Sequence, residues 1–200
     1  MPLSSLQELY VEQLKDLYSA EQQITAAMPK MIQATKHQEL RAGFEKHLQQ
    51  TAEQIRRLER ISRSLGQSLD GEECKAMKGL VEEGEHMMKK RADSDVLDAA
   101  LIAAAQRIEH YEMAGYGCAR TYAQLLGREE EASLLQQTLD EEGTTDKLLT
   151  DMAERVINVD ALRGSDREVS MQSSREAGRD RTAESTAASR TRDDIGHEAR

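Results

Sequence analysis

Four stretches of the chain carry apolar residues at alternating steps of three and four positions, and this spacing constrains the possible folds more than any other feature. Such steps keep side chains on one face of an α-helix, so each stretch predicts a helix with one apolar side. The first stretch opens with Ser5 and Glu8 in a capping-box pattern. Its apolar positions are Tyr10, Leu14, Leu17, Ile24, Met28 and Met31. Helices of this kind bury their apolar sides against one another, and the sequence predicts an all-α, four-helix bundle.

Helix-capping residues indicate where the other bundle helices begin and end. Pro29 predicts a kink near the end of the first helix. The second helix is expected from about Glu39 to Gly66. The third is expected to begin with Ser94 as its N-cap and to end at Gly127, and the fourth follows directly.

The remaining segments are a long connection and a C-terminal extension. Residues 67–93 are enough chain for the third bundle helix to run parallel to the second, and their apolar side predicts a short extra helix over about 72–90. Residues 161–200 are rich in Arg, Ser, Thr and acidic residues and hold few large apolar side chains. The expected organisation is a bundle domain over 1–160 followed by a disordered, charged tail over 161–200.

Composition narrows the class of protein further. Aromatic residues make up 3% of the 200 residues and Trp is absent, so the core must consist of Leu, Ile, Met and Ala. A net charge of −10 argues against a nucleic-acid partner, because phosphates repel an acidic surface. Two scattered cysteines, an N-terminus without a secretory signal and the lack of a membrane-spanning apolar run predict a cytoplasmic protein without a membrane partner.

Polar residues interrupt each of the four apolar stripes near its middle. They are Glu21 in the first helix, His47, Thr51 and Gln54 in the second, Glu109 and Glu112 in the third, and Glu142 and Asp146 in the fourth. If the stripes face inward, five carboxylates meet at mid-bundle. Several bare anions cannot share a dry interior, and hard oxygen ligands of this kind suit iron or manganese.

Simpler interpretations remain open for individual positions. A Glu on a stripe can be a flanking residue that reaches solvent, and His47 can be a packed core histidine or a residue near a metal. His110 points off the Glu109/Glu112 face and is expected either behind the ligands, as a residue that supports one of them, or at the surface. Tyr116, one turn from Glu112, can pack or hydrogen-bond a ligand carboxylate. The Glu83-x-x-His86 motif lies in the connection and is interpreted as a coincidence.

Three blocks of this sequence resemble the YciE/YciF family of bacterial ferritin-like proteins. They are DLYSAEQQI (16–24), ALIAAAQRIEHYEMAGYG (100–117) and TLDEEGTTDKLLTDMA (138–153). The resemblance covers residues 1–160 and implies a rubrerythrin-related bundle, usually dimeric, associated with bacterial stress responses. It implies metal carboxylates at Glu21, Glu109, Glu112 and Glu142, with Asp146 a turn beyond.

The second helix departs from the family pattern. Relatives commonly read HLEET, with a carboxylate at the position of Gln50, or HLEQT, and carry His or Gln at the position of Gln54, whereas this chain reads HLQQTAEQ. Glu53 lies nearby and is a possible replacement. The favoured hypothesis is a homodimeric protein that binds a pair of iron or manganese ions through Glu21, Gln54, Glu109, Glu112, Glu142 and Asp146 and carries out oxidase or peroxide chemistry. The alternative is a non-catalytic structural or interaction bundle with a degenerate metal site.

Overall fold

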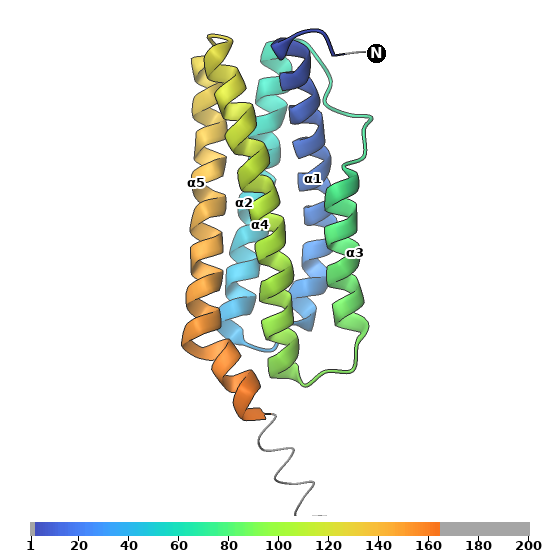
Figure 1. The fold of residues 1–200 in the computed structure, drawn as a ribbon, viewed down its shortest axis with the longest axis vertical. Helices are drawn as coiled ribbons and strands as arrows, with labels where there is room; N and C mark the ends of the chain where they lie inside the picture. Colours follow the sequence, from blue (N-terminus) through green and yellow to red (C-terminus); the bar gives the residue numbers. More distant parts are fainter. Residues whose placement is uncertain (1–2, 165–200) are drawn as a thin grey trace, which may run out of the picture.

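The computed structural model describes residues 3–164, and over that range the chain consists of helices and their connections, without a strand (Figure 1). The elements are α1 (Leu6–Ala34), α2 (Gln38–Leu65), α3 (Lys75–Lys89), α4 (Ser94–Leu125), α5 (Glu129–Met152) and a π-helical turn η1 (Ala153–Ile157). Residues 158–164 return to α-helix. The predicted all-α fold is confirmed, including the extra helix in the long connection.

The bundle consists of α1, α2, α4 and α5, which lie side by side along the long axis of the molecule (Figure 1). The connection after α2 carries the chain across to α3, which runs back beside α1 and α4, so α4 starts at the same end as α2 and runs parallel to it. This crossover is the one that the length of the connection predicted.

Caps explain most of the helix boundaries. The Ser5 hydroxyl accepts a hydrogen bond from the Glu8 backbone N–H at 3.2 Å, and the Glu8 carboxylate accepts one from the Ser4 N–H at 2.6 Å. Gly66 ends α2 in the left-handed conformation with φ 64°. The expected N-cap at Ser94 is wrong by one residue, because the Asp93 carboxylate accepts from the Asp95 N–H at 2.9 Å and so becomes the cap.

The apolar core is divided into two clusters by a polar layer. One cluster surrounds Phe44 and Leu101 and the other surrounds Leu58 and Tyr116. Between them lie the buried polar residues that interrupt the stripes. The stripes therefore do face inward, and the buried acids and the histidine that interrupt them lie at mid-height of the bundle.

The C-terminal boundary differs from the expected one. Helix continues past residue 160 to 164, so the first residues of the expected tail extend the last helix. The rest of the predicted tail lies outside the described residues. Within residues 3–164, the helices are too polar for any of them to cross a membrane.

Candidate metal centre

Four buried side chains from three helices meet at the centre of the polar layer. His47 from α2, Glu109 and Glu112 from α4, and Glu142 from α5 each offer one ligand atom, and these atoms all lie within 4.8 Å of one another. Nε2 of His47 lies 3.2 Å from Oε1 of Glu109 and 3.9 Å from Oε2 of Glu142. The side chains are at most 3% exposed, so water does not solvate them freely.

Two further buried residues adjoin this group. Glu21 on α1 is 0% exposed, and its Oε1 accepts a hydrogen bond from the Tyr116 hydroxyl. Gln54 on α2 is also 0% exposed, and its amide nitrogen donates to Oε1 of Glu142. Tyr116 thus bonds a predicted ligand carboxylate, as its spacing from Glu112 allowed. All four bundle helices contribute to the layer.

The layer leaves seven buried side-chain atoms without a hydrogen-bond partner among the described residues. They are Oε2 of Glu21, Nε2 of His47, Oε1 of Gln54, Oε2 of Glu109, both carboxylate oxygens of Glu112, and Oε2 of Glu142. Buried polar atoms in proteins are almost always paired, because each unpaired one costs about 1–3 kcal/mol. Seven in one layer indicate a site that is completed by something other than the protein.

Burial and mutual repulsion favour the neutral forms of these acids. Desolvation raises the pKa of Glu21, Glu109 and Glu112 well above 4.5, and the neighbouring carboxylates raise it further. The pKa of Glu142 rises to about 7, mainly through desolvation, while hydrogen bonds to this carboxylate oppose the shift. A divalent cation reverses this preference, since it favours ionised ligands.

His47 is oriented as a metal ligand. Burial lowers the pKa of its imidazole to about 4, so the ring is neutral near pH 7. Its Nδ1 lies 3.5 Å from Oγ1 of Thr145, and the Thr145 hydroxyl donates its proton to the Glu141 carbonyl at 3.1 Å. Thr145 can then only accept from His47, so we assign the ring proton to Nδ1. Nε2 is left with a free lone pair that points at the carboxylates.

The donor set fits a divalent metal ion of the first transition row. One imidazole nitrogen and several carboxylate oxygens suit iron or manganese better than the soft metals that thiolates bind. Glu109 and Glu112 are three residues apart on one helix, so both side chains lie on the same face of α4 and would face the same ion. The central group consists of one histidine and three glutamates, so its set of donor atoms is not made of carboxylates alone.

The structure brings together most, but not all, of the residues predicted from the sequence. Glu109, Glu112 and Glu142 are in the central group, with Glu21 and Gln54 beside it. Asp146 is not in the group. Its Oδ1 accepts from the Gln106 amide at 3.0 Å and lies 3.3 Å from Nε2 of the exposed His110.

The second helix contributes His47 to the central group, and the carboxylate that the family pattern implies at Gln50 is absent. Gln50 lies at the α2–α5 surface beside Lys46 and Thr144, and Glu53 is 57% exposed and pairs with Arg56. Glu53 therefore does not replace the missing carboxylate. His47, whose role the sequence left open, is the residue of α2 in the central group, and its position on the stripe was the signal for it. Glu83 and His86 line an open surface groove beside Arg107, away from the central group.

Fold and centre together define a helical bundle with a buried histidine–carboxylate cluster. The DUF892 family, described as a domain of unknown function, matches residues 5–162, and the chain belongs to this family. Protein YciF of Escherichia coli (strain K12) is 40% identical over 159 residues, which are 79% of this chain and 96% of that protein. The predicted resemblance to YciF-type proteins is confirmed.

Solved structures agree with this assignment. The crystal structure of the E. coli stress protein YciF matches with a TM-score of 0.75 at 40% identity, over 78% of this chain and 99% of that one. YcfI from Rhodopseudomonas palustris matches with a TM-score of 0.71 at 39% identity, over 74% and 94%. A protein of Xanthomonas campestris pv. campestris, at 21% identity and a TM-score of 0.66, shows the same fold over 82% of this chain and 99% of that one.

Proposed function

We propose that this protein binds a pair of divalent iron or manganese ions in its polar layer and uses them in stress-related peroxide or oxidase chemistry. The observation that carries the proposal is the set of seven unpaired donor atoms in one buried layer. His47, Glu109, Glu112 and Glu142 would hold the first ion. The free oxygens of Glu21 and Gln54, with the remaining oxygen of a shared carboxylate, would hold the second.

The protein side of this chemistry follows from the residues. Bound iron or manganese would supply the electron transfer to an oxidant such as hydrogen peroxide. Thr145 keeps the lone pair of His47 directed inward, and the Tyr116 hydroxyl holds Glu21 in place. The two apolar clusters above and below exclude bulk water, which strengthens every charge interaction inside. The similarity to a protein described as a stress protein supports a stress-related role.

Metal content of purified variants tests the proposal. The parent protein and two carboxylate-to-amide variants, Glu112→Gln and Asp146→Asn, are produced without a metal-binding tag, loaded with Mn(II) or anaerobic Fe(II), desalted and measured by elemental analysis. Glu112→Gln should lose most of the bound metal, because both its unpaired oxygens lie in the layer. Asp146→Asn should keep it, because Asp146 bonds Gln106 outside the group.

Two outcomes would contradict the proposal. A parent protein that retains no metal after loading would rule out the site itself. Equal metal content in the parent and in Glu112→Gln would show that the ions bind elsewhere. Peroxide consumption by the metal-loaded parent, lost in Glu112→Gln, is the expected activity.

A further inference from the structure

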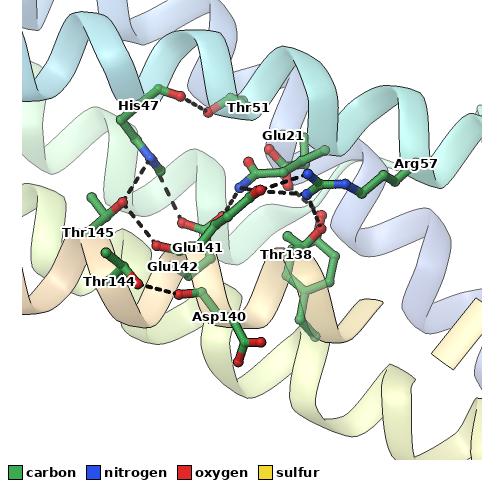
Figure 2. A network of polar contacts seen from close by, with 12 residues as sticks. Glu21, His47, Thr51, Arg57, Thr138, Asp140, Glu141, Glu142, Thr144 and Thr145 are labelled. Carbon is green, nitrogen blue, oxygen red and sulfur yellow. Dashed lines mark hydrogen bonds and ion pairs between the residues drawn. The ribbon is translucent and has the colours of Figure 1, made fainter. Parts of the chain in front are cut away.

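A chain of polar side chains connects the buried centre to the surface between α2 and α5. The Arg57 guanidinium donates two parallel hydrogen bonds to Glu141, from Nη1 to Oε2 at 2.6 Å and from Nη2 to Oε1 at 2.7 Å. The Gln54 amide nitrogen donates both to Oε2 of Glu141 at 3.2 Å and to Oε1 of Glu142 in the centre. Figure 2 shows Arg57 and Glu141 meeting beside the centre that holds His47 and Glu142.

The outer members of this chain are open to solvent while the inner members are not. The side chains of Arg57 and Glu141 are 19% and 27% exposed, whereas Gln54 and Glu142 are fully buried. Gln54 therefore bridges one carboxylate that water reaches and one that it does not. Its own carbonyl oxygen, Oε1, is buried and has no hydrogen-bond partner in residues 3–164.

The surface between α4 and α5 also carries an acid, Asp146, but no chain of hydrogen bonds among residues 3–164 leads from this acid to the centre. Asp146 there is 19% exposed, and its carboxylate contacts Gln106 and His110. Neither partner belongs to the central group or bonds one of its members in the described part of the chain. The bundle ends are closed by the two apolar clusters, and α3 covers the side of α1 and α4.

We propose that divalent cations enter the centre between α2 and α5, with Glu141 as the first ligand and Arg57 as the group that closes the route. This inference rests on the proposed function. Both oxygens of Glu141 are occupied by Arg57, so a cation must displace the guanidinium before it can bind there. Once Arg57 has moved outward, the Gln54 amide, whose nitrogen now bonds both carboxylates, has to turn so that its free Oε1 faces them. Glu141, Gln54 and Glu142 then form a series of oxygen donors that replace the water ligands of the ion step by step.

The route also explains why Arg57 and Glu141 are paired. An unpaired acid beside the centre would add a negative charge to a crowded group of acids, and Glu141 does raise the pKa of Glu21 and Glu142. Arg57 neutralises that charge until a cation arrives, and its own charge lowers the pKa of the same two acids. The Arg57 guanidinium is thus a cation that already occupies Glu141. Metal uptake exchanges this cation for the metal ion.

Rates of metal uptake test the proposal, with Co(II) as the probe because its visible absorption reports binding directly. Stopped-flow mixing of the metal-free, full-length protein with Co(II) gives the association rate, and chelator competition gives the dissociation rate. Glu141→Gln should slow association about tenfold, since it removes the charge that attracts and first binds the ion. Arg57→Gln should speed association, because the ion no longer has to displace a guanidinium.

Asp146→Asn is the matched control. It too converts a partly exposed acid of α5 to its amide, but at the edge that is not connected to the centre, so its association rate should equal that of the parent. Because Glu141 is a residue of the route and not of the final site, Glu141→Gln should slow dissociation as well and change the Kd much less than the rates. Circular dichroism confirms that each variant is folded.

The outcomes separate this inference from the proposed function. Association rates equal to that of the parent in both Glu141→Gln and Arg57→Gln would overturn the route, as would an Asp146→Asn variant that slows as much as Glu141→Gln. A parent protein that binds no Co(II) at equilibrium would overturn the proposed function and the route with it. If Glu141→Gln fails to fold, Arg57→Gln decides alone, because an unchanged association rate in that variant contradicts a gate formed by Arg57.

Discussion

At the scale of single residues, the contact between Tyr116 and Glu21 shows how the bundle tolerates a buried acid. Both side chains are 0% exposed, and the Tyr116 hydroxyl donates to Oε1 of Glu21. That hydrogen bond lowers the pKa of Glu21 and so opposes part of the rise that desolvation causes. Tyr116 therefore offsets part of the cost of burying the ionised form of Glu21.

Replacing Tyr116 by Phe should destabilise the protein by about 1–3 kcal/mol, because it leaves a buried carboxylate oxygen unpaired. Chemical denaturation of the metal-free protein measures this change. Tyr122→Phe is the control, since the Tyr122 hydroxyl makes no side-chain hydrogen bond within residues 3–164. Equal unfolding free energies for the two variants would show that the Tyr116–Glu21 bond does not stabilise the fold.

Individual site residues could be predicted where a stripe position alone decides the direction of a side chain. Glu109, Glu112 and Glu142 replace apolar residues in regular stripes, and such positions face inward in any bundle built from them. Asp146 was misplaced because it lies four residues after Glu142, and at the edge of a helical face a small rotation of α5 decides between centre and surface. The tautomer of His47 depends on Thr145 from another helix, so the sequence of α2 holds no information on it.

At the scale of helices, Asp98 performs a capping function that its own sequence neighbourhood does not reveal. It lies on α4 and is 1% exposed, and its carboxylate accepts hydrogen bonds from the backbone N–H groups of Lys36 at 3.0 Å and His37 at 2.8 Å. His37, the N-cap of α2, makes no capping hydrogen bond with its side chain. A carboxylate from a distant helix thus caps α2 and ties the α1–α2 turn to α4.

Replacing Asp98 by Ala should cost about 2–4 kcal/mol of unfolding free energy, because two backbone donors lose a charged acceptor inside the protein. Asp98→Asn, which keeps one acceptor oxygen, should cost less. The control is Asp95→Ala on the same helix, where an exposed ion pair with Lys36 is lost at a cost of about 0–1 kcal/mol. Similar losses for Asp98→Ala and Asp95→Ala in urea denaturation would contradict the capping role.

Helix number and order were predictable because spacing and caps act locally. Ser5 caps the start of α1 and Gly66 ends α2, as the sequence predicted. Both residues act on backbone groups within a few positions of themselves. The shift from Ser94 to Asp93 arises because two adjacent residues can both cap, and the choice depends on side-chain geometry. The cap of α2 by Asp98 was not predictable, since a contact over 61 residues leaves no local pattern.

At the scale of the whole molecule, the polar layer divides what would otherwise be one continuous apolar core. The two clusters on either side supply the hydrophobic stabilisation, while the layer between them buries four acids and a histidine at a cost to the metal-free protein. Because the layer destabilises the metal-free fold, the free energy of unfolding should depend on pH and on whether metal is bound. The homodimer that the family resemblance predicts stays a prediction.

The pH dependence of the metal-free protein follows from the direction of each pKa shift. Burial raises the pKa of Glu21, Glu109 and Glu112 well above 4.5 and that of Glu142 to about 7. Above pH 4.5 the unfolded chain releases protons that the folded chain keeps, so these acids make stability fall as pH rises. His47 acts in the opposite direction between its folded pKa of about 4 and the ordinary 6.5. Above pH 6.5 the decline from the acids is unopposed.

Metal should reverse this trend. Ligands must be ionised to bind a cation, so affinity and the stabilisation it brings increase with pH. Thermal unfolding at pH 6.5 and at about pH 8, in chelator and in excess Mn(II), should show a falling Tm in chelator and a widening gap between the two conditions. Glu112→Gln should flatten the decline in chelator, because one buried acid no longer has to ionise, and should abolish the gap. A Tm in chelator that increases from pH 6.5 upward would mean that these acids are already ionised in the folded protein, and the charge balance assigned to the layer would be wrong.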